Sequence, residues 1–365
     1  MPASRTAKVP PARVVRAVEG ARARLQRLSQ LMVPAPLALL ELAQGSMMTQ
    51  AIYVAAELRV ADVLRDGPLS AEEIARKVNA NPEAVYRLLR LLASYSIFAE
   101  LSDRRFKLTP MAEALRSDTP NSMRGMAVLM GHPIHWEDWG HLVDSVRTGE
   151  PSLPKLRGMG AFEYLESNPE YGAVFYQGVT NLSDLETAPI LAAYDFSRYH
   201  TIVDVGGGRG ALLAGILQRS TNSRGILFDS RAVNSGAEAV MADAGVADRC
   251  TIESGGLFDP VTPGGDAYVL KHIVHDWPDS KTLEILKNVR DAISADGRLL
   301  LIEFVPTEGN AQHPGKLVDL WLMLLVGGKE RTPAQYSELL ASAGFRLDRV
   351  VQTASPVSIV EARPT

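Results

Sequence analysis

The chain has 365 residues, of which 46% are hydrophobic and 22% are charged. This ordinary globular composition excludes a disordered or collagen-like chain, and the length predicts two domains. The single cysteine, Cys250, excludes an internal disulfide framework and a cysteine-based metal cluster, so we expect a cytoplasmic protein. No stretch reaches the roughly 18 apolar residues of a membrane span. A net charge of −4 gives no positive field for nucleic acid, so we expect neither a membrane nor a nucleic-acid partner.

Basic residues are concentrated at the start of the chain. Residues 1–30 contain seven Arg or Lys residues and a single acid, Glu19, which gives this segment a charge of +6. An Arg-rich segment with few acids can be an organellar transit peptide. We favour a disordered, solvated tail over residues 1–30, because no later feature depends on this segment.

Residues 31–115 carry the signals of a winged helix. Ser70 and Glu73 form a capping box that opens a helix over residues 71–78. Asn81 and Pro82 are an N-cap and a first-turn proline, and they open a second helix with one apolar stripe. Two short β-rich runs, residues 97–101 and 105–108, then predict a hairpin.

Winged helices bind DNA or act as interfaces, and both interpretations apply to this domain. The second helix has Arg87 and Arg90 but also Glu83, whereas specific DNA binding needs a denser basic face. Its apolar stripe suits a dimer interface instead. We therefore predict a homodimer formed through residues of this N-terminal domain.

The rest of the chain predicts an α/β fold. Residues 116–190 are interpreted as a helical connector that forms the acceptor pocket. In residues 191–365, short β-rich runs alternate with helical runs, which is typical of a parallel sheet with crossover helices. The last two runs, 346–353 and 356–362, are joined by a very short link that only an antiparallel pair permits. We predict a Rossmann-like catalytic domain that ends in an antiparallel hairpin.

A glycine run follows the first of these strands. Gly206, Gly207 and Gly208 stand where a strand meets a helix, and Asp229 ends the next strand 23 residues after Gly206. Glycines at this edge let a ligand approach the backbone, and the acid can accept the ribose hydroxyl protons of a nucleoside. Gly206-x-Gly208-x-x-Ala211 also satisfies the dinucleotide fingerprint, so a nicotinamide-dependent oxidoreductase remains an alternative, as does a simple tight turn.

Three titratable residues are expected at the same edge of the sheet. His275 follows one strand, Glu303 ends the next, and Glu330 precedes a later helix. An imidazole oriented by carboxylates is a suitable general base. Each residue also has a structural interpretation: His275 as a loop residue packed on Trp277, Glu303 as a solvated strand end, and Glu330 as a charge at a helix start.

In order along the chain, three motifs carry a family resemblance: Asp204-Val205-Gly206-Gly207-Gly208-x-Gly210, Lys271-x-x-x-His275-Asp276-Trp277 and Gly327-Gly328-Lys329-Glu330-Arg331-Thr332. Together they resemble the S-adenosylmethionine-dependent O-methyltransferases of the plant caffeate/flavonoid type and their actinobacterial relatives in natural-product tailoring. The resemblance covers nearly the whole chain after residue 30.

This resemblance implies methyl transfer from S-adenosylmethionine to a hydroxyl of a small aromatic or polyketide-like acceptor, with S-adenosylhomocysteine as product. We expect that hydroxyl to be phenolic. It implies His275 as general base with Glu303 and Glu330 beside it, no metal, and Asp276 as a structural residue. The implied cofactor-binding residues are Ser183, Gly206, Gly207, Gly208, Asp229, Gly256, Leu257 and Lys271. Some relatives keep the cofactor but catalyse decarboxylation or hydroxylation, and His275 favours methyl transfer.

The chain departs from the family pattern at two positions. Gly256 stands where the family has an aspartate near the adenine amino group, and Ser230 replaces an apolar residue beside the ribose-binding acid. One hydrogen bond to a neutral group contributes about 0.5–1.5 kcal/mol. These changes therefore affect cofactor affinity more than cofactor identity. The sequence does not specify the acceptor or the position that is methylated.

Overall fold

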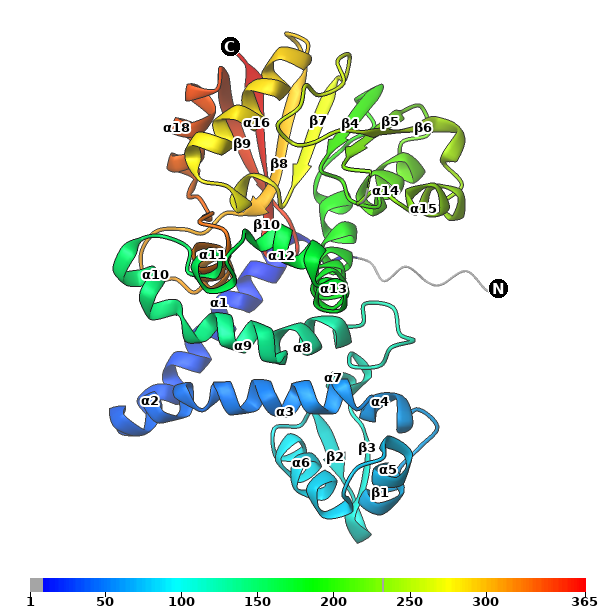
Figure 1. The fold of residues 1–365 in the computed structure, drawn as a ribbon, viewed down its shortest axis with the longest axis vertical. Coiled ribbons are helices and arrows are strands. Elements are labelled where there is room, and N and C mark those ends of the chain that lie inside the picture. The colour runs from blue at the N-terminus through cyan, green and yellow to red at the C-terminus, as the bar shows by residue number, and fades with distance from the viewer. Residues whose placement is uncertain (1–8, 232) are drawn as a thin grey trace. The chain divides into compact units, whose positions relative to one another are not determined.

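The computed structural model describes residues 9–231 and 233–365, which form two compact units (Figure 1). The sheet unit contains the described residues up to 23 together with residues 144–154 and 186–365. The winged-helix unit contains residues 24–143 and 155–185. The predicted connector, 116–190, is divided between these units, and the four-part division made from the sequence stays a prediction.

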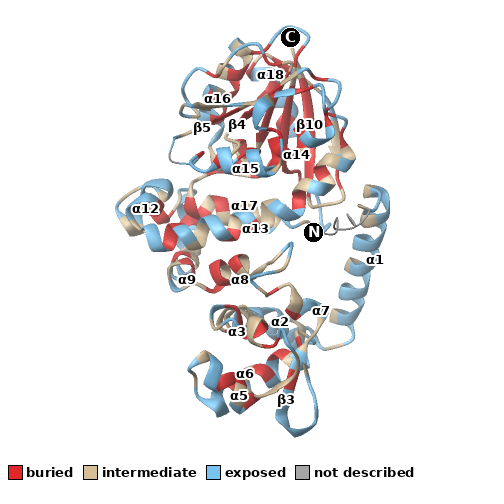
Figure 2. Ribbon diagram, turned by 90° about the vertical axis from the view of Figure 1, so that its right-hand side faces the viewer, coloured by how far each residue is buried: buried red, intermediate tan, exposed pale blue. Residues whose placement is uncertain are grey.

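The basic N-terminal segment forms a helix where the sequence analysis predicts disorder. Helix α1 spans Ala12–Leu31, none of its residues is buried, and it is exposed along its length in Figure 2. The helix is rich in alanine, arginine and leucine, which have high intrinsic helix propensity, so it needs no buried face to be helical. The prediction of a disordered tail is wrong for residues 12–30, and residues 1–8 lie outside the described part.

The winged-helix unit follows the order predicted from the sequence. Its first elements are α2 (Ala35–Ala43), α3 (Gly45–Glu57), α4 (Val60–Val63), β1 (Leu69–Ser70), α5 (Ala71–Val78), α6 (Pro82–Ser94), β2 (Phe98–Glu100), β3 (Arg105–Leu108) and α7 (Pro110–Glu113). The capping box of Ser70 and Glu73 is formed, and Asn81 caps α6. Strand β3 pairs antiparallel with both β1 and β2, which makes the wing.

The core of this unit is formed by the apolar stripes of its helices. Val85, Leu89 and Leu92 of α6 are buried against Ile74 of α5 and Phe106 of β3. Further helices belong wholly or partly to this unit: α8 (Arg124–Gly131), α9 (Pro133–Gly140), α12 (Ala161–Ser167) and α13 (Pro169–Ala193). Burial of such a stripe is the main source of helical stability in proteins.

The sheet unit contains a seven-stranded sheet with the order β6-β5-β4-β7-β8-β10-β9. The strands are β4 (Thr201–Val205), β5 (Arg224–Asp229), β6 (Cys250–Ser254), β7 (Ala267–Lys271), β8 (Arg298–Phe304), β9 (Phe345–Gln352) and β10 (Val357–Pro364). The pairs from β6 to β8 are parallel, and β10 is antiparallel to both β8 and β9. The α/β fold predicted from the sequence is confirmed.

Helices cover both faces of this sheet (Figure 1). These helices are α14 (Ala211–Arg219), α15 (Ala237–Asp243), α16 (Asp279–Ala292) and α18 (Pro333–Ser342). The unit also contains α17 (Gly315–Leu325) and most of α10 (Leu142–Thr148), which begins in the other unit. The segment α11 (Leu153–Arg157) begins in this unit and ends in the other. Alternate residues of β4 are buried on opposite faces, because side chains alternate along a strand. Because β4, β5, β7 and β8 pair parallel, their carboxyl ends share one edge of the sheet.

No helix among the described residues is long and apolar enough to cross a membrane.

Candidate active site

The glycine loop connects β4 to α14 at the carboxyl edge of the sheet. Gly206 and Gly208 have φ angles of +71° and +62°, a region that favours glycine. The Gly206 N–H donates to the Phe228 carbonyl at 2.8 Å, which fixes the start of the loop on β5. A Cβ atom on Gly206 would lie 2.3 Å from the Ile273 side chain, whereas one on Gly208 would meet no atom of the described chain within 4 Å. The loop is thus packed at Gly206 and open at Gly208.

Asp229 lies directly beside this loop, as the sequence predicts. Its Oδ2 accepts a hydrogen bond from the Gly208 N–H at 2.8 Å, and its Oδ1 accepts one from the Ser230 N–H at 2.6 Å. Burial raises the pKa of the carboxyl group, and these two bonds oppose that effect. Each carboxylate oxygen has a further lone pair, so Asp229 can still accept protons from a diol.

A second acid, Asp204, lies beneath the glycine loop. A Cβ atom on Gly207 would come within 2.5 Å of its Oδ2. Asp204 is 1% exposed, and neither carboxylate oxygen has a hydrogen-bond partner among the described residues. Burial and the nearby Asp229 carboxylate raise the pKa of Asp204 to about 7. An unsatisfied acceptor beside an open glycine backbone fits a ligand that carries hydrogen-bond donors.

The loop after β6 also reaches this edge. The Leu257 side chain lies 3.2 Å from the position that a Cβ on Gly206 would take, so Leu257 adjoins the glycine loop. The Gly256 N–H donates to Asp259 Oδ2 at 2.7 Å. Sequence reasoning noted the missing carboxylate at Gly256 but did not identify Asp259, which places a carboxylate against the same backbone.

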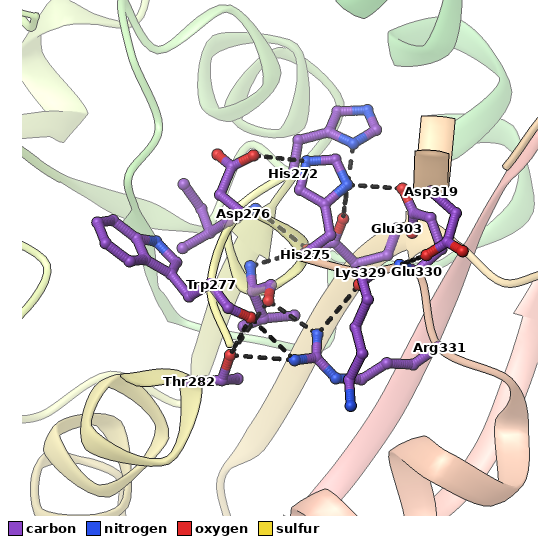
Figure 3. A network of polar contacts seen from close by, with 12 residues as sticks. His272, His275, Asp276, Trp277, Thr282, Glu303, Asp319, Lys329, Glu330 and Arg331 are labelled. Atoms are coloured by element: carbon purple, nitrogen blue, oxygen red, sulfur yellow. Dashed lines mark hydrogen bonds and ion pairs between the residues drawn. The ribbon is translucent and has the colours of Figure 1, made fainter. Parts of the chain in front are cut away.

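His275 is the centre of a buried carboxylate cluster (Figure 3). It lies in a short 3-10 helix, Val274–Asp276, between β7 and α16, and is 7% exposed. Its Nδ1 is 2.7 Å from Glu330 Oε1 and 3.4 Å from Glu303 Oε2. The opposite nitrogen, Nε2, is 3.5 Å from Asp276 Oδ1. The structure thus brings together the three residues predicted as the catalytic group.

Glu303 is held through its carboxylate, and Glu330 is held through its own backbone N–H. Glu303, in β8, accepts hydrogen bonds through Oε1 from the N–H groups of Ile273 and Val274, both at 3.1 Å. The backbone N–H of Glu330 donates to Asp319 Oδ1 on α17 at 2.8 Å. The Glu303 carboxylate is therefore fixed by backbone donors, whereas the Glu330 carboxylate is held by its contact with His275 on a backbone that Asp319 anchors.

Electrostatics favours the protonated form of this imidazole. Burial alone lowers the pKa of His275, but the carboxylates of Glu303, Asp276 and Glu330 outweigh burial and raise the pKa to about 10. Burial raises the pKa of Asp276 to about 6, although the neighbouring His275 opposes that shift. With Nδ1–H donating to Glu330, Nε2 is the nitrogen that can take up a further proton.

A second imidazole next to this cluster is not predicted by the sequence analysis. His272 has a φ of +54°, which is rare for a residue with a Cβ. Its Nε2 is 2.9 Å from Glu186 Oε2, and its ring stacks on His275 with centroids 5.0 Å apart. Burial alone would raise the pKa of Glu186, but the nearby His272 and Lys271 outweigh burial and lower this pKa to about 2. Its position on α13, 86 residues before His272, leaves no local sequence signal.

Two predicted cofactor residues have other surroundings. The ammonium of Lys271 pairs with Glu186 Oε2 at 2.9 Å, so its predicted contact with adenosine stays a prediction. Ser183 lies on α13 within the winged-helix unit, and its role also stays a prediction.

Potential metal-donor atoms of His272, His275 and Glu303 lie within 4.8 Å of one another. The same atoms make the imidazole–carboxylate contacts described above, so this spacing has an explanation without an ion. The prediction of a metal-free reaction is left to experiment.

Comparisons with known proteins agree with this arrangement. A family model described as an O-methyltransferase domain matches residues 139–346, and one described as an O-methyltransferase dimerisation domain matches residues 40–118. A phenazine O-methyltransferase from Lysobacter antibioticus is 41% identical over 332 residues, which is 91% of this chain and 97% of the relative.

An 8-amino-8-demethylriboflavin N,N-dimethyltransferase from Streptomyces davaonensis is 33% identical over 319 residues, covering 86% of this chain and 91% of the relative. The crystal structure of NcsB1, an O-methyltransferase from neocarzinostatin biosynthesis in complex with S-adenosylmethionine and 2-hydroxy-5-methyl naphthoic acid, has a TM-score of 0.74. NcsB1 is 33% identical, with 87% of this chain and 96% of that chain covered.

The chain therefore belongs to the S-adenosylmethionine-dependent O-methyltransferase family. Its cofactor is S-adenosylmethionine, and the resemblance stated from the sequence motifs is confirmed. Family membership rejects the nicotinamide-dependent oxidoreductase that the glycine fingerprint alone had allowed. The open backbone at Gly208, the carboxylate of Asp229 and the unsatisfied acceptors of Asp204 fit a cofactor with a ribose diol and a charged amine.

Proposed function

We propose that this enzyme methylates a hydroxyl of a small aromatic acceptor and that His275 is the general base. The observation that carries the proposal is the 2.7 Å contact between His275 Nδ1 and Glu330 Oε1. Glu303 Oε2 lies 3.4 Å from the same nitrogen. That contact fixes the imidazole so that Nε2 can receive the acceptor proton. The named relatives act on phenazine and flavin compounds, which supports a flat aromatic acceptor.

When bound, S-adenosylmethionine supplies an electrophilic methyl carbon on a neutral leaving group. Asp229 would hold the ribose and the glycine loop would pass along the methionine part. His275 takes the hydroxyl proton at Nε2 as the oxygen becomes a nucleophile. Glu303 and Glu330 stabilise the imidazolium that forms, because each places negative charge near it. The buried position of the cluster strengthens this electrostatic effect.

We infer that the dimer predicted from the sequence is a homodimer formed through residues 31–110. The match of a dimerisation-domain model to residues 40–118 supports this inference. Light scattering of the full chain at micromolar concentration is expected to give twice the mass of one chain. A monomer under those conditions would remove the inference.

The acceptor class is tested by mass spectrometry of a panel incubated with S-adenosylmethionine that carries a trideuterated methyl group. The panel contains hydroxyphenazines, naphthols, hydroxynaphthoates and simple phenols, each paired with its amino analogue. Deuterated methyl ethers of the hydroxyl compounds are the expected products. Methylation of the amino analogues alone would identify an N-methyltransferase, and loss of carbon dioxide or gain of oxygen without a label would identify a decarboxylase or hydroxylase.

A further inference from the structure

Arg331 is a fully buried arginine one residue after Glu330. It is 1% exposed, and it is the largest fully buried side chain of the described residues. Burying a guanidinium is costly unless its donors are satisfied, so its position requires an explanation. Sequence reasoning included Arg331 in a motif but gave it no role.

The guanidinium binds the backbone on both sides of His275. Nη1 donates to the Val274 carbonyl at 2.8 Å, and Nη2 donates to the Trp277 carbonyl at 3.0 Å. These carbonyls stand one residue before His275 and two residues after it. Asp279, at the start of α16, accepts from Nε at 3.1 Å and from Nη2 at 2.8 Å. One planar fork thus spans the whole loop that carries the base (Figure 3).

Two further contacts join the same loops. The Lys329 N–H donates to the His275 carbonyl at 2.9 Å. Gly328 allows this approach, because a Cβ atom there would lie 2.0 Å from that carbonyl oxygen. The segment 327–332, which carries Glu330, is therefore fastened to the segment 274–279, which carries His275.

We propose that Arg331 is a positioning residue for methyl transfer, whose guanidinium clasps these two segments and thereby holds the Glu330 carboxylate at His275 Nδ1. The proposal rests on the proposed role of His275 as general base. Arg331 reaches the reaction through Glu330 and His275, because its guanidinium donates to neither of their side chains. Its hydrogen bonds go to Val274, Trp277, Asp279, Thr282 and Lys329.

Lysine at this position keeps the charge but loses the planar fork, so it cannot bind both carbonyls and Asp279 with the same geometry. In the full-length enzyme, Arg331→Lys is expected to lower kcat about 10-fold, since misplacing a catalytic group by about 1 Å can cost up to 10²-fold. KM for S-adenosylmethionine and affinity for S-adenosylhomocysteine should be unchanged. If Glu330 is held less firmly, its carboxylate raises the pKa of His275 by a smaller amount. The alkaline limb of the pH–rate profile should therefore move to lower pH.

Arg249→Lys is the matched control. Arg249 also donates to three backbone carbonyls, those of Leu217, Ser220 and Ser223, but it lies in the part of the unit around α14 and β6. We expect both lysine variants to lose a comparable amount of thermal stability. Only Arg331→Lys should also lose kcat and show a shifted pH profile. An unchanged kcat and profile in a folded Arg331→Lys enzyme would overturn the proposal.

A double-mutant cycle with His275→Ala separates positioning from a general structural role. If Arg331 acts through His275, Arg331→Lys should change the residual rate of His275→Ala by less than about twofold, because coupled residues are non-additive. An equal loss in both backgrounds would reject the clasp and leave the base assignment intact. Near-wild-type turnover of His275→Ala alone would instead reject the proposed base. If Arg331→Lys does not fold, Asp279→Asn, which removes the carboxylate partner of the guanidinium, serves in the same cycle, and a smaller but equally non-additive loss is expected.

Discussion

The sharpest prediction concerns proton transfer to His275. An ordinary histidine has a pKa near 6.5 and a phenol one near 10, so transfer between them is uphill by about 3.5 pKa units, or about 5 kcal/mol. In this structure the surrounding carboxylates raise the pKa of His275 to about 10. The proton then moves between groups of nearly equal affinity, so the transfer itself is nearly level. At pH 7 the cost lies instead in the prior deprotonation of the imidazolium.

The same shift determines the pH dependence of kcat/KM. Below pH 10 most of the free enzyme carries an imidazolium, so the neutral His275 that accepts the phenol proton is a minor fraction that grows about tenfold per pH unit. With an acceptor of pKa about 10, kcat/KM should rise about tenfold per pH unit from 7 to 9 and turn over near 10. With an acidic acceptor of pKa about 7, the rising limb should shift down to 7 while the alkaline limb stays near 10.

His275→Ala should lower turnover at pH 7 by about 10²–10⁴-fold, the usual contribution of a positioned general base. Affinity for S-adenosylhomocysteine, measured by calorimetry, should persist because neither the glycine loop nor Asp229 is altered. The residual rate should rise with free phenolate and show no turn near pH 10. The control is His200→Ala, which replaces an exposed histidine immediately before β4. Near-wild-type methylation by His275→Ala at pH 7 would refute the assignment.

Three further outcomes are expected. Asp229→Ala should weaken S-adenosylhomocysteine binding by about 1.5–3 kcal/mol, the range for a charge-assisted hydrogen bond, and an unchanged calorimetric affinity would contradict its placement at the ribose. Prolonged dialysis against EDTA should leave the methylation rate unchanged, because the potential donors of His272, His275 and Glu303 already contact one another as imidazoles and carboxylates. A loss that zinc or magnesium restores would show that the cluster holds an ion. Deleting residues 1–25 should leave the thermal midpoint and kcat within error, because α1 has no buried residue, and a lowered midpoint would show that this helix is needed for stability.

Local sequence signals predict the helices that begin with a capping residue. The capping box of Ser70 and the Asn81–Pro82 helix start are formed where the sequence places them. Such signals act within one turn of helix, so they do not depend on the rest of the fold. The order of strands is a different matter: β10 lies between β8 and β9, a placement that no residue of the hairpin specifies locally.

The candidate site shows the same division. Asp229, His275 and Glu303 follow or end strands, and parallel strands gather their carboxyl ends at one edge, so their meeting could be predicted. Glu186 comes from a helix in a distant part of the chain, and its contact with His272 depends on tertiary packing. The disorder predicted for residues 12–30 was wrong, because it rested on the absence of any later feature that depends on this segment and not on the high helix propensity of its alanine, arginine and leucine residues.

Features that cost stability gather around the candidate site. His272 has a left-handed backbone, Gly328 has no room for a Cβ, and Arg331 and Glu303 are buried charged residues. Each would weaken an isolated element, since strained backbone and buried charge both oppose folding. They are compatible here because the buried groups satisfy one another: carboxylates contact the imidazoles, and backbone carbonyls accept hydrogen bonds from the guanidinium. Such mutual satisfaction fixes the imidazole before the acceptor binds, so little reorganisation remains for the reaction itself.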